Sequence, residues 1–379
     1  MVEQDPQSAT LASAPAKGVP IFRRLVIWSV LLTLAIAMLI TFGRHAVSWM
    51  ERIRGTDYFA LYSAGATMTY DYDRLIGHEL QTQQQLGKGP FYLRFPYPPH
   101  LLYILVPFAR LPFTTSHILF SLLNFLLLAL GFALVNGKRV AGWLALLAFQ
   151  PVYENLMLGQ YAGIVFLGYA LLVWAERQER PARWTILGLV LLTLKPQFAL
   201  FPFVYMFSQG GWRRRASLLA AALALLVVSI SFIAIGLDEI PKAVDMALGV
   251  VIGEEYRLFD VRTEFGPPFL FWILWAGGLL FAFFAKPNHF QWVILLSILM
   301  SPTVAAHDLI YLLVLIPYIA SDYAVVVIAL APLLALVGRS VVKPIFFLYA
   351  ALGAVILLAK WDQREDRKRH HSPSSTRIV

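Results

Sequence analysis

Ionisable side chains interrupt an otherwise apolar chain at a few positions, and these are the residues that could do chemistry. Asp57 follows the first apolar run, whereas Glu154, Lys195, His307 and Asp308 interrupt later ones. A carboxylate can act as a general base toward a hydroxyl group, and a cation can bind a phosphate. Because an ionisable side chain buried without a partner in a membrane is costly, each of these residues is a candidate for function.

The aspartates near the start of the chain also have a structural interpretation. Asp57 could cap the helix that follows it, and taken alone it is more often a cap than a base. Asp71 and Asp73 form an Asp-x-Asp pair that could bind a metal ion. For this pair the favoured interpretation is a cap on the turn that begins at Arg74.

Composition identifies the class of protein. The chain has 379 residues, of which 59% are hydrophobic and 14% are charged, whereas soluble domains carry roughly 25% charged residues. Long apolar runs recur, which predicts an all-α polytopic membrane protein. The absence of cysteine excludes disulfides, thiolate catalysis and cysteine-bound zinc. The net charge of +9 is explained by membrane topology, so we expect membrane lipids and no nucleic acid as partners.

Basic clusters set the predicted topology, because cationic flanks favour the cytoplasm. The clusters at 138–139, 177–183 and 213–215 are placed inside, so the apolar stretches between them must each cross an even number of times. The stretch at 184–207 is then a hairpin of two short helices with Lys195 at its outer apex. Extending this pattern gives a bundle of about twelve transmembrane helices, several of them short, with both termini cytoplasmic.

The predicted organisation is a single membrane domain with polar extensions. Residues 25–42, 114–135 and 216–236 are expected to cross the membrane, and residues 101–111 to lie as a helix in its interface. The parts are a disordered cytoplasmic N-terminus (1–20), a transmembrane domain (21–360) with external loops at 44–113 and 237–266, and a basic cytoplasmic tail (361–379).

The topology places the interrupting residues on one side of the membrane. Lys195 could instead extend to the interface, Glu154 could form a structural salt bridge, and His307 with Asp308 could cap a helix. Each alternative is reasonable alone. However, all four residues fall at predicted outer apices, on the side of Asp57. Arg94, Arg110 and His100 are expected to add positive charge there, which suits a phosphate.

An ordered series of short motifs extends over most of the chain. They are Asp57-Tyr58, Tyr97-Pro98-Pro99, Pro107, Leu111-Pro112, Asn155 with Gly159-Gln160, Leu194-Lys195-Pro196, and Ser301-Pro302 ahead of His307. In this order the chain resembles glycosyltransferase family 87, whose members are GT-C-class membrane enzymes dependent on polyprenol-phosphate sugars. The last apolar runs and both tails add nothing to the resemblance.

The resemblance implies a function and a set of site residues. The expected reaction moves a hexose, mannose in particular, from a polyprenyl monophosphate to a lipid or glycan acceptor at the external face of the cell membrane. It implies that Asp57 is the catalytic base, while the lipid-linked donor is a substrate and no cofactor is needed; the metal requirement is left open. The residues implied to bind donor phosphate or substrate are Arg94, Tyr97, Gln160, Lys195, His307 and Asp308.

Two non-enzymatic functions are the alternatives. A transporter or lipid flippase would be expected to show internal repeats and a charged path through the bundle, whereas the inner halves of these apolar runs carry almost no charge. A structural or assembly subunit would not need polar residues at the outer apices. The transferase therefore remains the leading hypothesis.

Overall fold

The computed structural model describes residues 21–52, 57–87, 95–178, 182–252, 268–301 and 306–318. Within these ranges the chain is helical throughout and forms no strand, as the composition predicts. The two tails, and residues 319–360 of the predicted transmembrane domain, lie outside the described residues.

Three of the described helices are long and apolar enough to cross a membrane. They are α1 (Ile21–Arg52), α5 (Phe113–Asn136) and α11 (Gly211–Ile235). Each coincides with a predicted span, and α5 and α11 differ from it by at most about five residues at an end. Helix α1, however, continues ten residues beyond the predicted end of its span at residue 42, into the predicted external loop. Leucine, isoleucine and valine dominate their exposed faces, which suits contact with lipid tails.

Shorter helices fill the stretches that were expected to be hairpins. The stretch at 184–207 is confirmed as two short helices joined at Lys195. The stretch after Arg139 contains three helices, because it breaks at Phe149 as well as at Gly159. The number of about twelve crossings stays a prediction. The short helices are α6 (Val140–Ala148), α7 (Gln150–Leu158), α8 (Ala162–Arg177), α9 (Ala182–Leu192), α10 (Pro196–Ser208), α14 (Pro268–Phe284), η3 (Pro287–His289), α15 (Phe290–Leu299) and η4 (Ala306–Tyr318).

The two predicted external loops also contain helices. The first forms α2 (Tyr58–Thr67), α3 (Tyr72–Gln85) and α4 (Pro99–Ala109). Helix α4 is the one expected at 101–111, begun two residues earlier because Pro99 suits the first turn of a helix; its location in the interface stays a prediction. The second loop forms α12 (Glu239–Ile252), which the sequence analysis did not identify.

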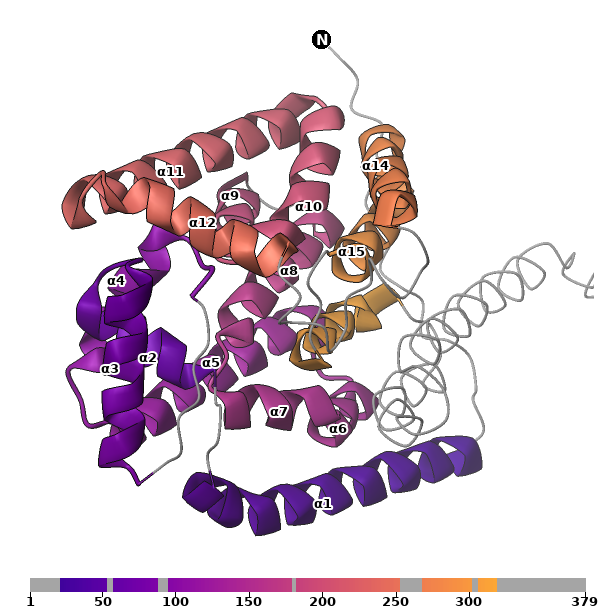
Figure 1. The fold of residues 1–379 in the computed structure, drawn as a ribbon. Coiled ribbons are helices and arrows are strands. Elements are labelled where there is room, and N and C mark those ends of the chain that lie inside the picture. Colours follow the sequence, from indigo (N-terminus) through magenta and orange to yellow (C-terminus); the bar gives the residue numbers. More distant parts are fainter. Residues whose placement is uncertain are drawn as a thin grey trace, which may run out of the picture.

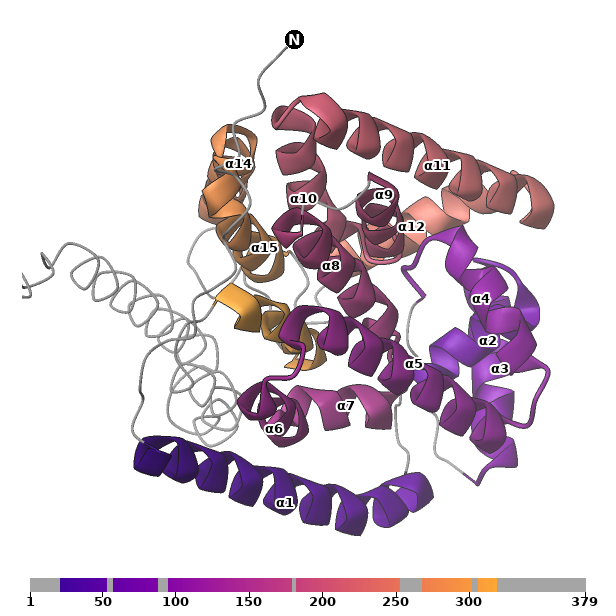
Figure 2. The ribbon, with the colours of Figure 1, turned by 180° about the vertical axis from the view of Figure 1, so that it is seen from behind.

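Helix α8 lies at the centre of the arrangement (Figure 1). It packs between α5 and α9 and also contacts η4. Helices α2, α3 and α4 form a group to one side, and α10 packs against α14 and α15 on the other. Helix α1 lies along the lower edge against α6 and α7, which the reverse view also shows (Figure 2).

Small residues bring the central helices close together. A Cβ atom added to Gly188 in α9 would lie 2.8 Å from the carbonyl oxygen of Gly168 in α8, and one on Gly168 would lie 2.9 Å from the carbonyl oxygen of Gly188. Only glycine at both positions permits this separation, as is common between membrane helices. The close packing fixes the ends of α8 and α9, where the polar residues described next are found.

Candidate active site

Four interruptions between helices converge on one polar cluster. Asp57 precedes α2, Gln160 separates α7 from α8, Lys195 separates α9 from α10, and Asp308 lies in the first turn of η4. The sequence analysis placed these residues at apices on one side of the membrane. The structure joins their side chains in two hydrogen-bonded pairs, Asp57 with Gln160 and Lys195 with Asp308, and the charges of the second pair act on Asp57.

The capping interpretation of Asp57 is wrong in this structure. Its carbonyl oxygen accepts the first hydrogen bond of α2, from the amide of Leu61 at 3.2 Å, but its carboxylate makes no cap hydrogen bond. The carboxylate instead accepts a hydrogen bond from Nε2 of Gln160, which lies 103 residues further along the chain. Asp57 is therefore held by a tertiary contact, and its other carboxylate oxygen is not engaged by α2.

Asp71 shows the opposite outcome. It caps α3, accepting a hydrogen bond from the backbone amide of Arg74 at 3.1 Å, as the favoured interpretation predicts. Asp73 occupies the exposed first turn of the same helix. Within the described ranges, no group of three histidine and acidic side chains is placed to hold a metal ion.

Gly159 positions Gln160 against Asp57. It ends α7 in the left-handed region, with φ of +68°, which favours glycine. A Cβ atom there would lie 2.7 Å from Cβ of Tyr58 and 2.8 Å from the ring of His117. Tyr58 is buried, and its hydroxyl lies 2.6 Å from Oγ of Ser116 in α5. The turn at Gly159 therefore fits tightly beside the start of α2. This close fit places the side chain of Gln160 against the carboxylate of Asp57.

The surroundings of Asp57 change its basicity. Burial raises the pKa of its carboxyl to about 6, while the hydrogen bond from Gln160 and the charge of Lys195 act in the opposite direction. The charges of Asp308 and Glu154 raise the pKa further. A carboxylate with this pKa is ionised at neutral pH and is a stronger base than an ordinary aspartate.

Lys195 and Asp308 form a buried ion pair. Nζ of Lys195 donates a hydrogen bond of 2.6 Å to Oδ1 of Asp308, and the two side chains are only 4% and 3% exposed. The ammonium also lies 5.2 Å from the ring centre of Tyr161, within the range of a cation–π interaction. The alternative in which Lys195 extends to the interface is therefore wrong, and the sequence analysis missed its partnership with Asp308.

Tyrosines form a wall beside this pair. The ring of Tyr97 packs edge-on against the ring of Tyr161, with centroids 5.1 Å apart. Tyr161 is completely buried, and its hydroxyl donates a hydrogen bond of 3.1 Å to the carbonyl oxygen of Leu194. The sequence analysis selected Tyr97 but not Tyr161, although Tyr161 directly follows Gln160 at the same helix break. Tyr161 could have been selected from the sequence, because it is an aromatic residue directly after the Gly159-Gln160 motif.

The remaining predicted residues have mixed outcomes. Arg94 lies outside the described residues, and His307 belongs to η4 in a part whose side chain is not described. His100 does not supply the expected positive charge, because burial lowers the pKa of its imidazole to about 4 and leaves it neutral at pH 7. Glu154 accepts a hydrogen bond from Gln150 at 2.8 Å and acts on Asp57 through its charge.

The fold and the site together define a polytopic helical membrane protein with a half-buried aspartate of raised pKa and a buried ion pair. Residues 95–360 match the model of glycosyltransferase family 87, and the chain belongs to this family. It is therefore a membrane glycosyltransferase, which takes a sugar donor and an acceptor. The matched range includes Gln160, Lys195 and Asp308 but begins after Asp57. Neither the curated proteins nor the solved structures give a match to the chain.

Proposed function

We propose that this glycosyltransferase moves mannose from a polyprenyl monophosphate to a lipid or glycan acceptor at the external face of the cell membrane, with Asp57 as the general base. The observation that carries the proposal is the hydrogen bond from Gln160 to the Asp57 carboxylate, next to the buried pair of Lys195 and Asp308. It combines an oriented base with a cation in one enclosed place.

The reaction follows from these groups. The acceptor hydroxyl oxygen attacks the anomeric carbon of the sugar, and the bond from that carbon to the donor phosphate oxygen breaks. Asp57 takes the hydroxyl proton as the new glycosidic bond forms, and the polyprenyl phosphate leaves with the electron pair of the broken bond. Gln160 holds the Asp57 carboxylate in place, so that one carboxylate oxygen can face the acceptor.

Lys195 suits the charge of the leaving phosphate. An ammonium group has three hydrogen-bond donors, and the contact with Asp308 uses one of them. Asp308 holds the lysine side chain in place when no donor is bound, since an unpaired charge is costly to bury. Arg94 and His307 are proposed as further phosphate contacts, and Tyr97 as a contact to the donor near Tyr161.

Contacts across the molecule support the proposed membrane face. Thr69 and Tyr70 of the first predicted external loop donate hydrogen bonds to Glu239 of the second, so these segments lie on one side. At the other side, Arg213 forms an ion pair of 2.9 Å with Glu176, and both belong to segments predicted to be cytoplasmic. Because nucleotide sugars are cytoplasmic, an external site calls for a lipid-linked donor.

The proposed function is tested with radiolabelled polyprenyl-phosphate-mannose. The purified protein is reconstituted into liposomes with a lipid and glycan extract from source-cell membranes as acceptor, and transfer of label is compared for wild type and Asp57→Asn. We expect transfer by the wild type and its loss in the variant. Transfer from other polyprenyl-phosphate sugars but not from the mannose donor would correct the sugar alone, whereas activity only with nucleotide sugars would reject the proposal.

The face is tested by single-cysteine labelling, which is clean because the chain has no cysteine of its own. Asp238→Cys, at an exposed position of the second predicted external loop, should react with a membrane-impermeant maleimide on intact cells or spheroplasts. Arg214→Cys should react only after the membrane is opened. External labelling at position 214 contradicts the hairpin topology.

The role of Lys195 is tested by donor kinetics. Because the phosphate is charged in the ground state as well as in the transition state, Lys195→Ala should chiefly raise the apparent KM for the mannose donor. The protein concentration is normalised to the folded fraction, because loss of a buried partner also affects folding. Wild-type kinetics over a full donor titration would remove Lys195 from the phosphate site.

A further inference from the structure

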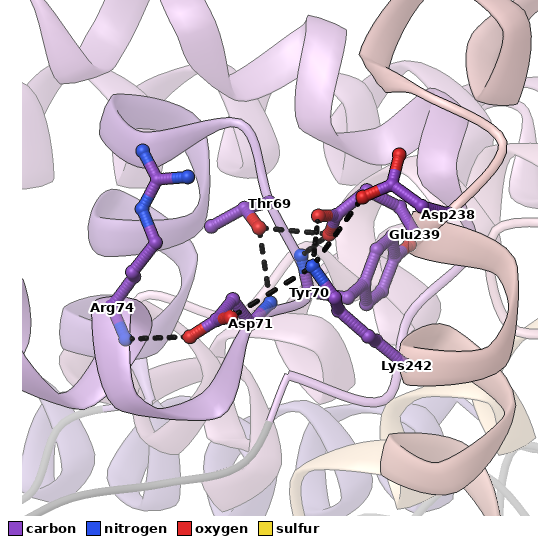
Figure 3. A network of polar contacts seen from close by, with 7 residues as sticks. All are labelled: Thr69, Tyr70, Asp71, Arg74, Asp238, Glu239 and Lys242. Atoms are coloured by element: carbon purple, nitrogen blue, oxygen red, sulfur yellow. Dashed lines mark hydrogen bonds and ion pairs between the residues drawn. The ribbon is translucent and has the colours of Figure 1, made fainter.

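A second polar cluster joins the two predicted external loops (Figure 3). The carboxylate of Glu239, at the start of α12, accepts hydrogen bonds from Oγ1 of Thr69 at 2.8 Å and from the backbone amide of Tyr70. Lys242 donates to the same carboxylate at 2.7 Å and lies 3.8 Å from Asp71. The turn between α2 and α3 is thereby fastened to α12.

Glu239 is the buried centre of this cluster. Its side chain is 6% exposed, whereas that of Asp238 is 79% exposed and that of Lys242 is 36% exposed. Burial acts to raise the pKa of Glu239, but hydrogen bonds from Lys242, Tyr70 and Thr69 outweigh it and leave the pKa below its ordinary value. The carboxylate is therefore ionised at neutral pH while it holds these donors.

Tyr70 connects the cluster to the candidate active site. Its backbone amide is bound by Glu239, and its hydroxyl donates a hydrogen bond to the carbonyl oxygen of Tyr97. Tyr97 packs edge-on against Tyr161, whose hydroxyl binds the carbonyl oxygen of Leu194, the residue before Lys195. A continuous series of contacts thus extends from Glu239 on α12 to the break that carries Lys195.

We propose that Glu239 is a positioning residue for the donor site, acting through Tyr70 on Tyr97 and Tyr161. This inference rests on the proposed function, because it takes Lys195 to contact the donor phosphate. When Glu239 binds the 69–71 turn, the hydroxyl of Tyr70 fixes the backbone at Tyr97, and the Tyr97 ring holds Tyr161 beneath the ammonium of Lys195. When it does not, the tyrosine wall is free to shift away from the ion pair.

Three variants test this inference by kinetics. Glu239→Gln keeps the shape of the side chain but removes its charge, and Tyr70→Phe removes only the hydroxyl while keeping the ring packed against Phe95 and Phe232. Asp238→Asn is the matched control, since it removes one negative charge at the exposed neighbouring position. We expect each of the first two to raise the KM for polyprenyl-phosphate-mannose roughly fivefold at nearly unchanged kcat, as for loss of one hydrogen bond, and the control to match wild type.

Combining the two variants tests whether they act along one series of contacts. If they do, Glu239→Gln adds little to the KM of Tyr70→Phe, since the contact it supports is already lost. Fully additive increases, or a wild-type KM in both single variants, overturn the inference. A merely structural Glu239 would lower thermal stability without changing the KM of the folded fraction.

A measurement independent of transfer separates this inference from the proposed function. Hydrogen exchange of peptides covering residues 95–101 should be faster in Glu239→Gln than in Asp238→Asn, because the Tyr97 backbone loses its support. If Asp57→Asn abolishes transfer but neither Glu239→Gln nor Tyr70→Phe changes the donor KM, the proposed function stands and this inference fails. If wild type transfers no mannose, the donor assignment fails. Equal hydrogen exchange in Glu239→Gln and Asp238→Asn would reject the proposed link from Glu239 through Tyr70 to Tyr97.

Discussion

Among the residues that the structure describes, two clusters bring a lysine together with aspartate or glutamate, and they differ in burial and in the segments that they join. In the cluster of Asp57, Gln160, Lys195 and Asp308, the ion pair is almost completely enclosed, with a contact of 2.6 Å. In the cluster of Asp71, Asp238, Glu239 and Lys242, the lysine is at the surface and only Glu239 is buried. The first brings together residues from four helix breaks, whereas the second joins two neighbouring loops.

The difference shows how to distinguish ionisable residues that could take part in the reaction from those that stabilise local structure. Asp71 makes a local hydrogen bond to its own helix. Lys242 is partly exposed and lies close to the carboxylates of Asp71 and Asp238. Asp57 leaves its own helix uncapped, and Lys195 is buried although its charge is costly to bury. Local stability explains the exposed residues of the second cluster. It does not explain the buried ion pair of the first cluster, which is why we assign the reaction to the first.

The largest expected effect compares the two aspartates. Asp57→Asn should lower kcat about 10²- to 10⁴-fold, the usual contribution of a general base, because asparagine cannot accept the acceptor proton. Asp71→Asn should leave kcat within about twofold of wild type, since asparagine also caps helices well. Both are measured with the radiolabelled mannose donor at saturating concentration.

Expression and thermal unfolding of both variants provide the control. Asparagine is close to aspartate in size, so both proteins should fold as the wild type does. If Asp57→Asn transfers mannose within about threefold of wild type, the base is not Asp57, since a lost base gives at least a hundredfold effect. If Asp71→Asn is the inactive variant, the comparison of the two clusters is reversed.

The next effect compares the two lysines. Asp308→Asn leaves the Lys195 ammonium buried without its carboxylate, and breaking a buried pair in this way costs about 3–5 kcal/mol of stability. Lys242→Met should cost less stability than Asp308→Asn, because that lysine is partly exposed and Glu239 keeps its bonds to Thr69 and Tyr70. Unfolding in detergent is followed by tryptophan fluorescence. Equal stability of Asp308→Asn and wild type would show that the pair is not enclosed in the membrane.

Sequence alone predicted the features that depend on local patterns. The three long helices follow from apolar length, and the break at Lys195 follows from the following proline together with the basic clusters on both sides. The cap at Asp71 follows from its place before a helical segment. These are properties of a few neighbouring residues, so a single sequence is sufficient to predict them.

The contacts between distant segments were not predictable in the same way. Nothing in the residues around Lys195 indicates that its partner is Asp308, which lies 113 residues away, and the partner of Asp57 lies 103 residues away. His100 was expected to be charged because its exposure could not be judged, and burial makes it neutral. Helix α12 was missed because acidic residues within 237–266 indicated an external loop, although most residues of Glu239–Ile252 are apolar.

The smallest expected effect is a shift in the pH dependence of kcat/KM. It is expected only from the cluster that contains Asp57. If Asp57 is the base, kcat/KM reports its ionisation in the free enzyme. With its pKa raised to about 6, kcat/KM should be level above pH 7 and fall tenfold per unit below pH 6. An aspartate at its ordinary value of 3.8 would keep the rate level down to about pH 5. Asp71→Asn should leave this profile unchanged.

Gln160→Leu tests the cause of the shift. Its hydrogen bond favours the ionised carboxylate, so its loss should raise the pKa of Asp57 and move the acidic limb of kcat/KM to higher pH. The sign is decisive, because a group that only contacts substrate would lower kcat/KM equally at every pH. Wild type and Gln160→Leu are compared from pH 5 to 8 with the mannose donor well below KM. A limb that stays in place, or moves to lower pH, would show that Gln160 does not act on the ionisation of the base.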